Sequence, residues 1–201
     1  MSRQTEIADA AIATLARDGM RGLTHRAVDR TAGLPEGSAS YYYRTRQALL
    51  QATVERLAEL DVAELPALPQ QDLEAFAHAT AELLQSWLTT GRQRQLARYE
   101  LALEATRRPE LRKVLVAAGA GLRAMIAERF AAAGVTEPQD RADDFAALLD
   151  GLIFGQIAGA GTRQLTAADL RAAVGVLLTA ITGGRFWPGR ERHFPRRETR
   201  A

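Results

Sequence analysis

Apolar residues recur every three or four positions along almost the whole 201-residue chain. This spacing places them on one side of an α-helix, and no segment shows the sustained alternation of apolar and polar residues that a strand requires. Glycine and proline interrupt the pattern at intervals, as they do at helix ends. We therefore predict an all-α fold of about nine helices, over residues 4–17, 24–31, 35–42, 46–65, 72–90, 92–106, 109–133, 137–158 and 167–181.

The composition excludes several classes of function. The chain has no cysteine, which rules out disulfides, cysteine-bound zinc and thiol catalysis. Its three histidines are far apart, and no GxSxG, HExxH, P-loop or dinucleotide-binding motif occurs, so we predict neither an enzyme nor a bound cofactor or metal. No apolar run approaches the ~20 residues of a membrane span, and no apolar leader follows Met1. We expect a cytoplasmic protein that does not enter a membrane.

Charge is distributed unevenly along the chain. Residues 1–50 carry a net charge of +2, residues 51–182 carry −4 and residues 183–201 carry +4. Basic ends indicate contact with a polyanion. Residues 183–201 are rich in glycine, proline and arginine and lose the helical spacing, so we predict a disordered tail. The alternative for this tail is an arm that binds DNA or a membrane surface without specificity.

Two short predicted helices joined by Ala32-Gly33-Leu34 have the pattern of a helix-turn-helix. Gly33 supplies the positive φ that the turn requires, and Leu34 fills the angle between the helices. The second helix then presents small and polar side chains that fit a DNA major groove, and basic side chains beside it are placed to contact phosphates. The predicted DNA-binding residues are Thr24, Arg26, Glu36, Gly37, Ser38, Ser40, Tyr41, Tyr42, Arg44 and Arg46.

Residues 3–50 resemble the DNA-binding domain of TetR-type transcriptional regulators. The chain departs from the usual pattern of that family at Asp29, where alanine is favoured, and at Ser40, where an aromatic residue is usual. We predict a DNA-binding domain over residues 1–48, a helical ligand-binding and dimerisation domain over residues 49–182, and the tail. The resemblance is carried by Ile7, Ala10-Ala11, Asp18-Gly19, Thr24, Val28, Ala32-Gly33-Leu34, Gly37-Ser38, Tyr41-Tyr42-Tyr43, Arg46 and Ala48-Leu49-Leu50.

The last two predicted helices have broad apolar faces. Small residues recur every fourth position from Ala147 to Gly159 and form a ridge that allows another helix to cross closely. The resemblance implies that these helices form a four-helix interface in a homodimer, and the alternative is that the ridge packs within one subunit. The predicted interface residues are Leu148, Gly151, Leu152, Gly155, Gly159, Leu170, Val174, Leu177 and Leu178.

The resemblance also implies a pocket for a small-molecule effector among the middle helices. The alternative for each candidate is an ordinary core position. Arg98, Glu100 and Glu104 are further polar groups near the same apolar set. The predicted ligand-binding residues are Phe76, His78, Leu83, Trp87, Tyr99, Leu103, Met125, Phe154 and Gln156.

Together these features predict a ligand-responsive transcriptional regulator. It would be a repressor that binds a palindromic operator in double-stranded DNA as a homodimer and that a small molecule releases. The helix over residues 46–65 would connect the DNA-binding domain to the body and transmit the ligand's effect. The alternative function is a helical ligand-binding or adaptor protein whose N-terminal domain does not bind DNA. Failure to shift any genomic duplex at low salt would identify that alternative.

Overall fold

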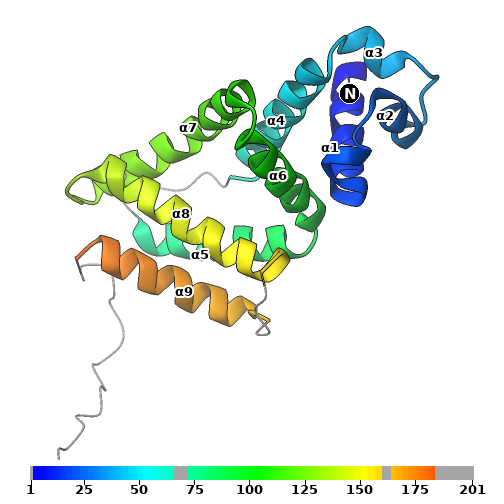
Figure 1. Cartoon of the computed structure of the whole chain (residues 1–201). Coiled ribbons are helices and arrows are strands. Elements are labelled where there is room, and N and C mark those ends of the chain that lie inside the picture. The colour runs from blue at the N-terminus through cyan, green and yellow to red at the C-terminus, as the bar shows by residue number, and fades with distance from the viewer. Residues whose placement is uncertain (1, 66–71, 160–163, 184–201) are drawn as a thin grey trace, which may run out of the picture.

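The computed structural model describes residues 2–65, 72–159 and 164–183. Within these ranges the chain forms only α-helices, as predicted, and α1–α3 lie at one end of the molecule with α9 at the other (Figure 1). The predicted tail falls outside the described residues apart from Gly183. The helices are α1 (Arg3–Gly22), α2 (His25–Ala32), α3 (Ser38–Tyr42), α4 (Arg46–Ala63), α5 (Leu73–Leu88), α6 (Arg92–Ala105), α7 (Pro109–Ala132), α8 (Pro138–Ile157) and α9 (Ala167–Ile181).

Side-chain caps explain where several helices begin. The Thr24 hydroxyl accepts a hydrogen bond from Ala27 N at 3.1 Å, and Thr45 accepts one from Ala48 N at the same distance. Thr166 and Asp169 form a reciprocal capping box at α9. Each cap satisfies a backbone N–H group that lacks an intrahelical partner.

Two predicted boundaries are wrong because of glycines with positive φ. The prediction started the third helix at Pro35, but α3 begins at Ser38, since Gly37 at φ 98° is its N-cap. The prediction ended the first helix at Arg17, whereas α1 continues to Gly22 across a kink at Gly19, where φ is 67°. The predicted turn at Gly33 is confirmed, because Gly33 ends α2 at φ 66°.

The N-terminal helices share a hydrophobic core with the body of the molecule. Ile7, Leu15, Val28 and Leu50 are completely or almost completely buried in one cluster with residues of α6 and α7, including Leu101 and Leu111. The Arg56 guanidinium of α4 also pairs with Asp9 of α1 at 2.7 Å. The predicted domain boundary at residue 48 therefore runs through a continuous hydrophobic core. The helices α1–α3 still lie together at one end of the molecule (Figure 1).

A second core joins α5, α7, α8 and α9. Phe76, Phe130 and Phe145 pack together there, with ring centroids 5.6–6.3 Å apart. Among the helices in the described ranges, none combines the length and apolarity that a bilayer crossing requires.

Candidate functional site

Asp29 fixes the position of α3 relative to α2. Its side chain is 2% exposed, and its two carboxylate oxygens accept hydrogen bonds from Gly37 N at 2.8 Å and from Ala39 N at 2.7 Å. Ala39, the second residue of α3, is completely buried. A negative charge that accepts N–H groups at a helix start is favourable. The outer face of α3 is consequently held in one orientation.

The outer face of α3 is rich in hydroxyl groups. Tyr41 and Tyr42 are 77% and 41% exposed, and their rings meet edge to face. The hydroxyls of Ser38 and Ser40 donate to the carbonyls of Pro35 and Gly37 at 2.7 and 2.9 Å, so their oxygens keep acceptor capacity. This face offers donors and acceptors that could read base edges in a groove.

The predicted phosphate-binding side chains have different surroundings. Arg44 is exposed, whereas Arg26 forms an exposed ion pair with Glu36 at 2.5 Å. The Arg46 guanidinium donates to the carbonyl oxygens of Leu23 and of Met20, the latter at 2.6 Å. Arg46 therefore ties the start of α4 to the end of α1, a role that the sequence analysis did not identify.

A cavity of about 380 Å³, here called the main cavity, lies among α5, α6, α7 and α8. Four predicted ligand-binding residues line it together with Phe145, Leu149 and Ile126: Phe76, Leu83, Trp87 and Met125. Its wall is mostly apolar and aromatic, with a few polar groups, which is typical of small-molecule sites.

The other five predicted ligand-binding residues do not line the main cavity. His78 is exposed and pairs with Glu82 at 3.2 Å, and Leu103 is 60% exposed. Tyr99 packs edge to face against Phe154, and Gln156 Oε1 accepts a hydrogen bond from Leu165 N at 2.9 Å. Helical spacing placed these side chains on middle helices but did not identify the face that meets the cavity.

Tyr99 nevertheless contacts the wall of the main cavity, because it is hydrogen-bonded to Asp150. Its hydroxyl donates to Asp150 Oδ1 at 3.1 Å, and Asp150 lines the main cavity. Burial, followed by the Asp150 carboxylate, raises the pKa of the Tyr99 hydroxyl above its ordinary value. Tyr99 therefore remains a protonated donor at neutral pH.

A second cavity of about 340 Å³, the α4 cavity, lies between α4, α6 and α7. Leu65, Arg98 and Leu122 line both cavities and so form part of their common wall. Arg98 forms an ion pair with Asp61 of α4, and its guanidinium lies over the Trp87 ring, 5.8 Å from the centroid. Arg98 was among the polar groups that the sequence indicated near the pocket, whereas nothing in the sequence pattern indicates Asp61 or Gln95.

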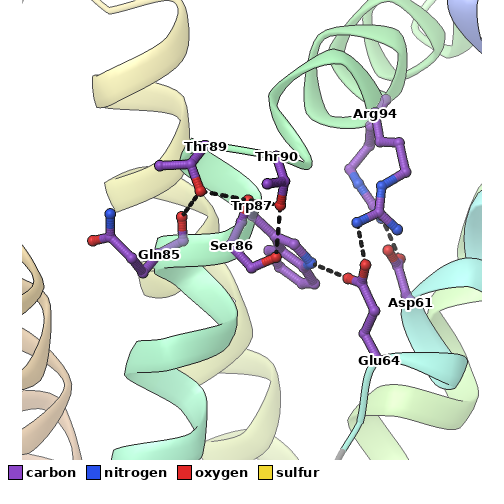
Figure 2. A network of polar contacts seen from close by, with 9 residues as sticks. Asp61, Glu64, Gln85, Ser86, Trp87, Thr89, Thr90 and Arg94 are labelled. Carbon is purple, nitrogen blue, oxygen red and sulfur yellow. Dashed lines mark hydrogen bonds and ion pairs between the residues drawn. The ribbon is translucent and has the colours of Figure 1, made fainter.

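The end of α4 is attached to α5 and α6 by a polar network (Figure 2). Trp87 Nε1 donates to Glu64 Oε2 at 3.0 Å, and the Arg94 guanidinium pairs with the other oxygen of Glu64. Because Trp87 lines the main cavity, this network connects the cavity wall to α4, the helix that follows α1–α3. Among the described residues, no group of three His, Asp or Glu is placed to hold a metal ion.

The predicted dimer residues fall into two groups. Leu170, Val174 and Leu178 are completely buried in the second core of the same chain, so they are not available to another subunit. Leu177 is partly buried against that core. In contrast, Leu148 is 50% exposed, Gly151 and Gly159 are exposed, and Leu152 and Gly155 are half-buried.

The middle of the small-residue ridge of α8, at Gly151 and Gly155, has no close neighbour among the described residues. A Cβ atom added at Gly151 or Gly155 would meet nothing within 4 Å. Phe154 and Val176 add exposed apolar area on α8 and α9. Within the described residues, Gly151 and Gly155 thus have no packing partner in the same subunit, which favours the predicted interface over the alternative.

Comparison with known proteins gives consistent matches. A family model described as "Tetracyclin repressor-like, C-terminal domain" matches residues 71–180. The chain is similar to the multidrug binding protein EbrR complexed with ethidium, with 31% identity, a TM-score of 0.69 and coverage of 88% of this chain and 98% of that one. The EbrR complex with proflavin has 33% identity, a TM-score of 0.61 and coverage of 90% and 100%.

A member of the TetR family from Streptomyces coelicolor is similar over a comparable length. It has 32% identity and a TM-score of 0.72, and the match covers 90% of this chain and 99% of that chain. No curated protein sequence matches the chain significantly.

Proposed function

The chain belongs to the TetR family of transcriptional regulators, and from this premise we propose that it is a repressor that binds a near-palindromic operator as a homodimer and is released by a small molecule. The observation that carries the proposal is the exposed face of α3, held in place by the buried Asp29 carboxylate. Tyr41, Tyr42, Ser38 and Ser40 on this face would contact base edges, and Arg44 would contact phosphate.

The exposed part of the α8 ridge supports the proposed homodimer. Gly151 and Gly155 leave room for the close approach of a second helix, and exposed Leu148 and Phe154 flank them. A dimer would place two copies of α3 against half-sites that are about one helical turn, ~34 Å, apart or somewhat more.

The main cavity would hold the effector. Its volume of about 380 Å³ and its aromatic wall suit a small molecule, and a similar protein, EbrR, is complexed with ethidium. A ligand that moved Trp87 or Arg98 would act on Glu64 and Asp61 at the end of α4, and thereby on the spacing of the two DNA-binding segments. Only a ligand that binds the two spacings with different affinity would change DNA binding.

A mobility-shift experiment with sheared genomic DNA tests this proposal. The full chain should shift a minority of fragments at moderate salt and nearly all of them at low salt, because phosphate contacts weaken as salt is raised. A protein that shifts no fragment even at low salt would contradict the proposal and support the ligand-binding or adaptor alternative.

A further inference from the structure

Gln95 is a deeply buried polar side chain in the wall of the main cavity. It lies on α6 and is 1% exposed, and its Nε2 group has no hydrogen-bond partner in the part of the chain that the structure describes. Buried polar groups are normally hydrogen-bonded, and an unmet donor is costly to keep. An acceptor atom supplied by a ligand would remove that cost.

The orientation of the Gln95 amide is fixed by its neighbour. Arg98 Nε donates to Gln95 Oε1 at 3.1 Å. A guanidinium can only donate, so the amide oxygen must face Arg98 and the Nε2 group must face away from it. The ion pair with Asp61 holds Arg98 in turn. The free position at Gln95 is therefore a donor and not an acceptor.

The other charged groups on the cavity wall already have partners. Arg123 pairs with Asp143 at 3.3 Å, and Asp150 accepts the Tyr99 hydroxyl. Both carboxylates belong to exposed residues, where water screens their attraction for a cation. The buried part of the wall thus offers an unmet donor, whereas its acidic groups lie at the water-accessible part.

We propose that the main cavity, taken as the effector site of the proposed regulator, binds a flat aromatic molecule that carries a neutral or anionic hydrogen-bond acceptor, such as a ring carbonyl. Gln95 Nε2 donates to this acceptor, while Trp87 and Phe76 pack against the ring system. Gln95 is then the specificity-determining residue that favours such ligands over aromatic cations of the same shape.

Acridone and proflavin are suitable probes, because both have a three-ring frame but acridone presents a neutral carbonyl and proflavin is a cation with amino donors. Each is titrated against the full-length chain without DNA, with probe fluorescence and Trp87 quenching as readouts in a Trp187→Phe background. We expect acridone to bind at least ten-fold more tightly than proflavin.

Gln95→Glu replaces the donor with a negative acceptor while keeping the contact with Arg98. It should weaken acridone binding about ten- to a hundred-fold, the loss expected when a buried hydrogen bond becomes a repulsion, and leave proflavin binding equal or stronger. Gln95→Met, which removes the donor at similar length, should also weaken acridone but leave proflavin unchanged. Circular dichroism and thermal unfolding confirm that each variant is folded. The matched control is Gln85→Glu on α5, outside the cavity lining, which should change neither affinity.

Three results would overturn the inference: proflavin binding at least as tightly as acridone, no binding of either probe, or acridone binding that neither Gln95 variant alters. DNA is absent from these titrations, so the outcome is separate from that of the mobility shift. A chain that binds acridone through Gln95 but shifts no DNA would refute the repressor proposal alone. A chain that shifts DNA but ignores acridone would refute only this inference.

Discussion

Asp29 determines where the exposed face of α3 points. Its two oxygens meet the N–H groups of Gly37 and Ala39, one before and one inside the helix. A helix of only five residues has little stability of its own, so an external partner for its first N–H groups matters more than in a long helix. The family's usual alanine would leave these donors without this acceptor.

Asp29→Asn should therefore destabilise the fold. The amide has one acceptor oxygen instead of two and places an NH₂ group against a backbone donor, which costs about 1–3 kcal/mol for the unmet group. Urea unfolding measures the loss, and the mobility shift should weaken in parallel. Asp18→Asn is the control, because Asp18 is exposed and pairs only with its neighbour Arg17. Equal stability of the two variants would contradict the role given to Asp29.

Arg44 and Arg46 are two residues apart but should respond differently to truncation. Arg44→Ala should lower the dependence of log K on log salt by about one unit and leave stability unchanged, as expected for a phosphate contact. Arg46→Ala should lower the free energy of unfolding by about 1–3 kcal/mol, since two carbonyl partners are lost, with little effect on the salt slope. Titrations at several salt concentrations combined with urea unfolding separate the two effects. If Arg46→Ala instead lowered the salt dependence and left the stability unchanged, Arg46 would have to leave the two carbonyl oxygens and bind DNA.

At the scale of the helices, the kink of α1 connects the N-terminal helices to α6. Gly19 adopts φ 67°, and the next backbone N–H, that of Met20, donates to Glu100 Oε2 at 2.9 Å. A side chain at Gly19 would be strained by this φ and would come within 3.5 Å of the Glu100 carboxylate.

Alanine substitutions at two glycines should therefore have opposite effects. Gly19→Ala should destabilise the fold by about 1–2 kcal/mol through backbone strain. Gly121→Ala lies inside α7, where an added Cβ meets nothing within 4 Å, and should stabilise by about 0.5–1 kcal/mol. Thermal and urea unfolding show whether each variant has a higher or a lower free energy of unfolding than the wild type. If Gly19→Ala also proved stabilising, the kink would not be required by the fold.

The helices and the turn at Gly33 could be predicted because they depend on local spacing and backbone chemistry. The role of Asp29 could not, because its partners are eight and ten residues later in the chain and meet it only once α2 and α3 pack. Periodicity showed that Leu170, Val174 and Leu178 are buried, but it does not reveal whether the covering helix belongs to the same chain. For Gln95, the sequence records a polar residue but not its burial or missing partner.

At the scale of the whole molecule, the proposed homodimer depends on the exposed part of the α8 ridge. Gly155→Leu has room in the isolated subunit, because no atom lies within 4 Å of the added Cβ. In a dimer the same side chain would force the crossing helices apart, at a cost of ~1–3 kcal/mol. We expect a dimeric wild-type chain and a variant that shifts towards monomer, measured by sedimentation at micromolar concentration. Gly121→Leu, at an exposed position of α7, is the control and should stay dimeric. A fully dimeric Gly155→Leu would place the interface elsewhere.

The most direct test of a ligand-released, dimeric DNA-binding protein is selection of duplexes from a random pool by the purified chain. Wild type should enrich a near-palindrome with half-sites about one helical turn apart, and Tyr42→Ala should enrich a different base at a matching position in both half-sites. Enrichment of no common sequence, or of a single half-site without its mate, would contradict the account.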